Sequence, residues 1–184
     1  MKVLITGAKG FIGKNLSLRL AEAGYSVLSF TRENSISDLY ELVSKTDYIV
    51  HLAAENRPRN PADFNLVNVG LTKALCDSIE ASQRQIPVIF TSSSQAETNT
   101  EYGVSKRVSE NLLLEKKKGL GIPLYIYRLP NVFGKWCRPN YNSVVATFCH
   151  NIANGLAIHI NKPSKMLTLV YIDDVVGDFI KKIN

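Results

Sequence analysis

Side chains in the middle of the chain have the types and spacing needed to deliver a proton to a carbonyl oxygen. An apolar run (PVIFTSSS) predicts a buried strand that ends in successive hydroxyls, Ser93 and Ser94 among them. Tyr102 follows, and Lys106 comes four residues later, on the same face of a helix. A free phenol has a pKa of about 10, which a nearby ammonium lowers. Tyr102 could therefore donate a proton to an oxygen that a serine hydroxyl holds.

Each of these residues, taken singly, also has a structural explanation. Hydroxyls at the end of a strand can form a turn, and Tyr102 could be a half-buried aromatic residue of its helix. A strand that ends in serine and is followed by Tyr-x-x-x-Lys is more specific than either part alone. We therefore favour a catalytic role for the set, while spacing alone leaves Ser93 and Ser94 as alternatives.

The N-terminal run Lys2 to Gly13 (KVLITGAKGFIG) predicts a strand, a glycine turn and a helix in immediate succession. A helix N-terminus offers unpaired N–H groups and the positive end of the helix dipole, which favour an anion. Gly7 permits the tight turn, Gly10 the approach of a pyrophosphate, and Gly13 the packing of helix on strand. The run predicts a dinucleotide site. An ordinary strand-to-helix turn is the alternative, because the spacing is G-x-x-G-x-x-G and a glycine trio alone is a weak signal.

The residues after the second predicted strand, Tyr25 to Phe30, indicate which dinucleotide binds. In a dinucleotide fold this position meets the adenosine ribose, where an acidic side chain binds the 2′-hydroxyl of NAD. Here it carries Thr31 and Arg32, and a guanidinium can form paired hydrogen bonds to a 2′-phosphate. We therefore expect NADPH as the cofactor, with a surface role for Arg32 as the alternative.

Strands and helices alternate along the chain, which predicts an α/β fold with a parallel sheet and right-handed crossovers. Helices are expected over residues 35–45, 63–81, 102–118 and 144–153, and further strands over residues 48–53, 122–129 and 167–171. The loop 55–61 follows the central strand, at the edge where ligands bind in open α/β sheets. Its Asn56, Arg57 and Arg59 are candidates for substrate contact, with ordinary loop polarity as an equal alternative.

Composition argues against several classes of protein. The chain carries a formal charge of +6, but its lysines and arginines are scattered and no nucleic-acid motif accompanies them. Its three cysteines and three histidines have no metal-like spacing, and His51, inside a strand, is expected to be a satisfied core residue. No apolar run reaches membrane-spanning length, and Met1 leads directly into the first strand. We therefore expect a cytoplasmic protein that binds no metal, no nucleic acid and no membrane.

The chain contains, in this order, GAKGFIG, HLAA, NVGLT, TSSS, YGVSK, RLPNVFG and YIDDVV. This set resembles the extended short-chain dehydrogenase/reductase family, which includes nucleotide-sugar epimerases, dehydratases and reductases. The resemblance implies a Rossmann-like, doubly wound parallel sheet with helices on both faces. It also implies an NADP(H)-binding domain over residues 1–134, followed over residues 135–184 by a small, incomplete substrate-binding part. It favours Ser93 as the catalytic hydroxyl, because Phe90 then matches the last apolar residue of the family's strand.

The same resemblance assigns residues to the ligands. Those expected at the cofactor are Gly7, Lys9, Gly10, Phe11, Ile12, Gly13, Thr31, Arg32, Leu52, Ala53, Ala54, Lys106 and Leu129. Those expected at a UDP-sugar substrate are Asn56, Arg57, Asn131, Lys135, Arg138 and Asn142. Lys106 would bind the nicotinamide ribose as well as lowering the pKa of Tyr102. Relatives dimerise through the helices expected over residues 63–81 and 102–118, so a homodimer is expected here.

The stretch from YRLPNVFG to NIANG is similar to capsular-polysaccharide reductases in which a cupin domain follows the reductase domain. That similarity implies NADPH-dependent reduction, at C4, of a UDP-4-keto-6-deoxy-N-acetylhexosamine to UDP-2-acetamido-2,6-dideoxy-L-talose, on the route to UDP-N-acetyl-L-fucosamine and capsule. The sequence departs from the pattern because it stops soon after YIDDVV, so the cupin domain is expected to be absent, as in a fragment or a shortened relative. The alternatives are an NAD-dependent nucleotide-sugar epimerase or dehydratase, and a dinucleotide-binding protein without catalysis.

Overall fold

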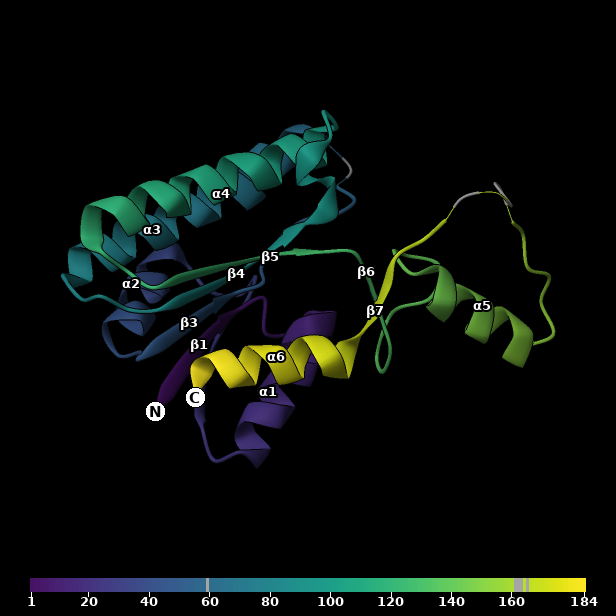
Figure 1. The fold of residues 1–184 in the computed structure, drawn as a ribbon, viewed down its shortest axis with the longest axis horizontal. Helices are drawn as coiled ribbons and strands as arrows, with labels where there is room; N and C mark the ends of the chain where they lie inside the picture. Colours follow the sequence, from purple (N-terminus) through teal and green to yellow (C-terminus); the bar gives the residue numbers. More distant parts are fainter. Residues whose placement is uncertain (59, 161–163, 165) are drawn as a thin grey trace. The chain divides into compact units, whose positions relative to one another are not determined.

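The chain, shown in Figure 1 as a computed structural model, is described over residues 1–58, 60–160, 164 and 166–184. It divides into two units, Met1–Arg128 and Leu129–Asn184. The division lies at the end of the last strand of the main sheet, and the cofactor-domain boundary after Gly134 stays a prediction.

A five-stranded sheet with the strand order β2-β1-β3-β4-β5 forms the centre of the first unit. Its strands are β1 (Lys2–Thr6), β2 (Ser26–Phe30), β3 (Tyr48–His51), β4 (Val88–Ser93) and β5 (Leu124–Leu129). β1 pairs in parallel with both β2 and β3, and β3 pairs in parallel with β4. The strand order therefore reverses between β1 and β3. In open α/β sheets, ligands bind beside the carboxyl ends of the strands at such a reversal.

Helices cover both faces of this sheet (Figure 1). α1 (Phe11–Glu22) lies on one face, and α3 (Gly70–Ser82) and α4 (Glu101–Leu120) lie side by side on the other, with α2 (Ile36–Ser44) against α3. A π-helical turn, η1 (Phe64–Val69), precedes α3, so the helix expected over residues 63–81 is divided in two. A 3₁₀ turn, η2 (Ser94–Glu97), joins β4 to α4. The doubly wound parallel sheet that the sequence predicted is confirmed.

Local sequence signals begin and end the helices. Ser35 caps α2 in a capping box, because its hydroxyl accepts from the Asp38 N–H while the Asp38 carboxylate accepts from the Ser35 N–H. Thr100 caps α4 by accepting from the N–H of Gly103. Gly121 ends α4 in the left-handed conformation, at φ 68°. An N-cap of this kind contributes about 1 kcal/mol to stability.

Residues of β1, α2, β3, α3, β4 and α4 share one apolar core. β3 and β4 are buried along their whole length, as expected for central strands of a parallel sheet. Among the fully buried side chains are Leu4, Ile49, Leu75, Ile79 and Phe90. Burying such a side chain contributes roughly 1.5–3 kcal/mol. The strands therefore give the groups at their carboxyl ends a rigid support.

In the second unit, β6 (Asn131–Phe133) pairs in parallel with β7 (Leu169–Tyr171). Its helices are α5 (Val144–Ala153), with the bounds that the sequence predicted, and α6 (Ile172–Ile183). β6 has no counterpart among the expected strands. Gly134 follows β6 at φ 134°, and a Cβ there would lie 2.5 Å from Cγ2 of Ile172. This turn therefore requires a glycine.

Candidate active site

Tyr102 and Lys106 lie one turn apart on α4, as the sequence predicted. Lys106 is 3% exposed, and its Nζ lies 4.5 Å from the ring centroid of Phe90 on β4. Within the described part of the chain its ammonium has no hydrogen-bond or ion-pair partner. Burial lowers the pKa of Lys106 to about 7, against the charge of Glu110, which raises it. A buried lysine with a strongly lowered pKa is typical of a functional site.

Ser93 is the last residue of β4 and is 8% exposed, whereas Ser94 is exposed at the start of η2. The Oγ of Ser93 accepts a hydrogen bond from the Gln95 N–H at 3.1 Å. Its own proton has no acceptor among the described residues, so the hydroxyl remains able to donate. Burial and this free proton favour Ser93 over Ser94 as the group that holds a substrate oxygen.

The first turn of α4 packs directly on η2, the segment that follows Ser93. A Cβ on Gly103 would lie 2.2 Å from the carbonyl oxygen of Gln95 and 2.9 Å from that of Thr98. Only a glycine permits this approach of two backbones. The neighbouring Tyr102 is half-buried, with its ring centroid 5.8 Å from that of Phe64 in η1. The contact therefore sets where the phenol lies relative to the end of β4.

The glycine turn brings the backbones of β1, α1 and the end of β3 into contact. Gly7 has φ 73°, and a Cβ there would lie 2.9 Å from the backbone of Ala53. A Cβ on Gly13 would lie 2.3 Å from the carbonyl oxygen of Gly7. Gly10 is the N-cap of α1, where no side chain caps the helix and the first turn holds no acid. The N–H groups of Phe11 and Ile12 are thus placed at an open helix N-terminus that can receive a phosphate.

Thr6 connects β1 to the residues after β3. Its Oγ1 accepts hydrogen bonds from the N–H groups of Leu52 and Ala53, both at 3.2 Å. It also bonds to Nδ1 of His51 at 2.6 Å, and the other ring nitrogen lies 3.0 Å from Oγ1 of Thr72. Burial, with the charge of Lys106, lowers the pKa of His51 to about 3. His51 is therefore the neutral, satisfied core histidine that the sequence predicted.

Arg32, expected at the adenosine ribose, and Lys9, expected at the cofactor, each form an ion pair. Nη2 of Arg32 donates to Oε2 of Glu55 at 2.6 Å, and Nζ of Lys9 donates to Oε2 of Glu33 at 2.6 Å. Thr31 donates its N–H to Oδ1 of Asn34 at 2.9 Å. The Lys9–Glu33 pair is exposed on both sides, whereas Arg32 is exposed and its partner Glu55 is mostly buried.

The expected substrate residues of the first unit lie in the loop after β3. The N–H groups of Asn56 and Arg57 donate to Oε1 of Glu55, at 3.2 and 3.4 Å. This leaves the amide side chain of Asn56 exposed at the carboxyl edge of the sheet. Arg59 lies outside the described residues.

The other expected substrate residues belong to the second unit. Asn131, in β6, donates its N–H to the carbonyl of Thr168 at 3.2 Å. Nζ of Lys135 lies 4.2 Å from the ring centroid of Trp136. The expected residues further along the loop are Arg138, whose guanidinium lies 5.6 Å from the ring of Tyr141, and the exposed Asn142. Two further residues were expected at the cofactor. Ala54 lies in the loop after β3, and Leu129 is the last residue of β5.

Asn68 is a buried polar residue to which the sequence analysis assigned no role. It is 2% exposed in η1, and its Oδ1 accepts from the N–H of Glu55 at 2.7 Å. Its Nδ2 donates to Oγ of Ser105 at 3.0 Å and to the carbonyl of Glu55 at 3.2 Å. Asn68 thus ties the loop after β3 to α4 beside Lys106. The signal available in the sequence was its place at the start of the segment NVGLT, one of those that resemble the family.

Glu110 and Arg128 also escaped the sequence analysis. The side chain of Glu110 is 5% exposed, and it accepts two hydrogen bonds from Arg128, from Nε at 3.0 Å and from Nη2 at 2.7 Å. Burial raises the pKa of Glu110, but the hydrogen bonds from Arg128 and the charges of Arg128 and Lys106 lower it more, so the carboxyl stays ionised. The spacing of Lys106 and Glu110, one turn apart, was the available signal.

Within the described residues, no cluster of metal-binding side chains is found. None of the helices described is both long and apolar enough to cross a membrane.

The NAD dependent epimerase/dehydratase family model matches residues 3–181 of this chain. The UDP-2-acetamido-2,6-beta-L-arabino-hexul-4-ose reductase of Pseudomonas aeruginosa is 55% identical over 182 residues, which are 98% of this chain and 49% of the relative. The crystal structure of the capsular polysaccharide assembling protein CapF from Staphylococcus aureus is 41% identical, with a TM-score of 0.89 over 100% of this chain and 50% of that chain.

More distant structures share the fold. The UDP-glucuronic acid 4-epimerase of Bacillus cereus, in complex with UDP-glucuronic acid and NAD, is 21% identical, with a TM-score of 0.87 over 100% of this chain and 73% of that chain. The present chain therefore spans about half the length of the Pseudomonas reductase and of CapF, and most of the length of the epimerase.

Proposed function

The chain belongs to the NAD dependent epimerase/dehydratase family, and from this premise we propose that it forms the catalytic part of an NADPH-dependent UDP-sugar reductase. The proposed reaction reduces a UDP-4-keto-6-deoxy-N-acetylhexosamine at C4 to UDP-2-acetamido-2,6-dideoxy-L-talose, toward UDP-N-acetyl-L-fucosamine and capsular polysaccharide. The similarity to a UDP-2-acetamido-2,6-beta-L-arabino-hexul-4-ose reductase, at 55% identity, supports this substrate class. The similarity to CapF supports the connection with capsule.

The observation that carries the proposal is the buried ammonium of Lys106 one turn from Tyr102. Removing an ammonium from water without a partner destabilises a fold, so packing gives no reason to keep it there. A catalytic phenol gives such a reason, because a nearby cation stabilises the phenolate and lowers the pKa of the phenol.

The mechanism follows from three side chains. NADPH, when bound, would supply the hydride that the C4 carbon of the substrate needs. Tyr102 gives its phenolic proton to the C4 oxygen, which turns the carbonyl into a hydroxyl. Lys106 stabilises the phenolate that remains on Tyr102. Ser93 donates its free hydroxyl proton to the same oxygen as a hydrogen bond and holds it beside the phenol.

The glycine turn and the residues after β3 fit a dinucleotide. The uncapped N-terminus of α1 offers N–H groups to the pyrophosphate, and Gly7, held against the backbone of Ala53, makes the tight turn that leads to it. The carboxyl edge of the sheet would be lined by the residues after β3, Leu52, Ala53 and Ala54. Lys106 would form a hydrogen bond to the nicotinamide ribose.

NADPH, rather than NADH, is proposed from the charges at the end of β2. Thr31 and Arg32 follow β2 directly, and the acidic Glu33 comes only after them and is paired with Lys9. A 2′-phosphate can replace Glu55 and Glu33 as the partner of these cations. A separate set of residues is proposed to bind the UDP-sugar, because its diphosphate needs fixed cations and hydrogen-bond donors. These residues are Asn56, Arg57, Asn131, Lys135, Arg138 and Asn142. A homodimer and a cytoplasmic location stay predictions.

A titration and an assay test the proposed function. NADPH should bind more tightly than NADH when nicotinamide fluorescence is followed, and the 4-keto sugar should then be reduced with loss of absorbance from NADPH. Tyr102→Phe should reduce turnover by about a hundredfold or more while the NADPH dissociation constant stays within about twofold. Turnover that does not depend on Tyr102, or no binding of either dinucleotide, would contradict the proposal.

A further inference from the structure

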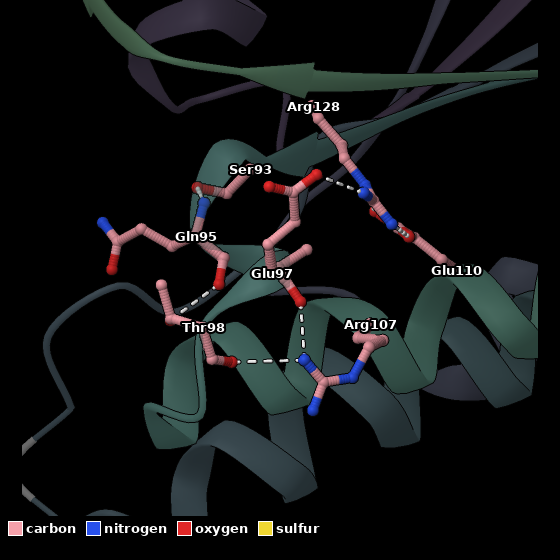
Figure 2. Close-up of polar contacts among 8 residues, drawn as sticks. Ser93, Gln95, Glu97, Thr98, Arg107, Glu110 and Arg128 are labelled. Atoms are coloured by element: carbon pink, nitrogen blue, oxygen red, sulfur yellow. Dashed lines mark hydrogen bonds and ion pairs between the residues drawn. The ribbon is translucent and has the colours of Figure 1, made fainter.

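We propose that Arg128 is a positioning residue, which holds the segment after Ser93 against the helix that carries Tyr102 and Lys106. The proposal rests on the proposed reductase function. Arg128 lies in β5, yet its guanidinium bonds two carboxylates from two other elements (Figure 2). One carboxylate is that of Glu97, at the end of η2, and the other is that of Glu110, on α4.

The two contacts use different nitrogens of one guanidinium. Nη1 of Arg128 donates to Oε1 of Glu97 at 2.9 Å, and Glu97 ends η2, four residues after Ser93. Nε and Nη2 donate to the two oxygens of Glu110, four residues after Lys106 on α4. A planar guanidinium can make these bonds together, and a lysine ammonium cannot reproduce the paired geometry.

Arg107 holds η2 from the α4 side. Its Nη1 donates to the carbonyl of Ala96 at 2.7 Å and to that of Thr98 at 3.2 Å, as Figure 2 shows. The contact of Gly103 with Gln95 and Thr98 lies at the same place. Together, these contacts bond η2 to α4 through Arg107 and to β5 through Arg128.

The two bonds of Arg128 differ in what they contribute. Glu110 is 5% exposed, so its carboxylate needs a partner and its pair with Arg128 belongs to the folded core. Glu97 is 74% exposed, and an exposed ion pair contributes little to stability. The contact with Glu97 can therefore be removed while the fold remains, which separates positioning from folding.

Positioning matters here because two donors must converge on one oxygen. The hydroxyl of Ser93 and the phenol of Tyr102 come from the two ends of the segment that contains η2. A shift of about 1 Å in a catalytic group can lower a rate about a hundredfold. A residue that only fixes η2 should therefore change turnover without changing the binding of NADPH.

The decisive variant is Glu97→Ala, compared with Glu97→Gln and with the matched control Glu41→Ala. Glu41, on α2 and away from this segment, is also an exposed glutamate in an ion pair, with Lys45 at the C-cap of that helix. Glu97→Ala should lower kcat about fivefold to twentyfold, with KM and the NADPH dissociation constant within about twofold. Glu97→Gln keeps an acceptor for Arg128 and should recover part of the loss. Glu41→Ala should match the wild type.

A second measurement does not depend on turnover. Amide hydrogen exchange in residues 94–103 should be faster in Glu97→Ala than in Glu41→Ala by about threefold or more, because one of the bonds that holds η2 is lost. Arg128→Lys should show the same change, and adding Glu97→Ala to it should give no further effect.

The outcomes are distinguishable. Unchanged kcat and unchanged exchange in Glu97→Ala would overturn the positioning role, even if Arg128→Lys fails to fold. A lower kcat together with equally weakened NADPH binding would also overturn the positioning role, since the substitution would then have disturbed the whole site and not only the position of η2. If turnover does not depend on Tyr102, the proposed reductase function fails, while the exchange data still decide whether Arg128 holds η2.

Discussion

The ammonium of Lys106 lies against the ring of Phe90, with Nζ 4.5 Å from its centroid, and Glu110 one turn further along α4 is the charge that supports its protonation. A cation over an aromatic face gains some electrostatic energy, but less than the hydration that burial removes. The fold therefore holds Lys106 at a cost, as is common for catalytic groups.

Lys106→Met should abolish turnover and raise the free energy of unfolding. The folded-state pKa of Lys106 is about 7, below its ordinary value of 10.5, so between these values the unfolded chain binds more protons and wild-type stability rises with pH. The gain from methionine should be on the order of a few kcal/mol below pH 7 and should disappear toward pH 10.5. Urea unfolding at pH 6, 8 and 10 measures it. Lys118→Met, on the exposed end of α4, is the control, and an equal gain at every pH would contradict the prediction.

Gly13→Ala should destabilise the first unit and weaken dinucleotide binding. Its Cβ would lie 2.3 Å from the carbonyl oxygen of Gly7 and 2.8 Å from the backbone of Ala8, so α1 must move. Such a clash costs about 1–3 kcal/mol or more. Gly119→Ala is the matched control, since a Cβ in that turn of α4 meets no atom within 4 Å. It should be neutral or stabilise by about 0.5–1 kcal/mol. Thermal unfolding and NADPH titration distinguish the two, and equal behaviour would refute the proposed role of Gly13.

Arg32→Ala should reduce the preference for NADPH over NADH. The guanidinium is exposed, and among the described residues it is paired with Glu55 alone, so the fold should tolerate its loss. Loss of paired bonds to a 2′-phosphate should weaken NADPH binding about tenfold or more and leave NADH almost unchanged. Lys9→Ala should weaken NADPH binding less than Arg32→Ala does. Arg84→Ala, which removes another exposed arginine, paired with Asp47, is the control and should leave both affinities unchanged. An equal loss for both dinucleotides in fluorescence titrations would rule out this phosphate contact.

Asn68→Ala should destabilise the fold and loosen the loop after β3. The substitution leaves the Glu55 N–H without its acceptor at 2.7 Å and removes the bond to Ser105. An unsatisfied buried group costs about 1–3 kcal/mol. Asn65→Ala, an exposed position of the same η1 turn, is the control and should change stability by less than about 0.5 kcal/mol. Denaturant unfolding measures both, and equal stabilities would mean that water replaces the amide of Asn68.

The sequence by itself determined most of the elements and their order, although it predicted neither β6 nor the separate η1 turn. Local signals are strong in this chain: the capping box of Ser35 and Asp38, the left-handed Gly121, and the apolar runs of the central strands. The one-turn spacing of Tyr102 and Lys106 likewise depends only on helix geometry. Alternation of strand and helix then determines a parallel sheet, because a crossover returns the chain in the same direction.

The tertiary structure decided what surrounds those elements. The contact of Phe90 with Lys106 joins β4 to α4. The hydrogen bonds of Asn68 join η1 to the loop after β3 and to α4. The bonds of Arg128 join β5 to α4 and to η2. No local pattern predicts these contacts, because each depends on the packing of segments far apart in the sequence. The charge state of Lys106 has the same origin. Spacing places an ammonium near a phenol, but only the packed interior removes the water that would otherwise keep its pKa near 10.5.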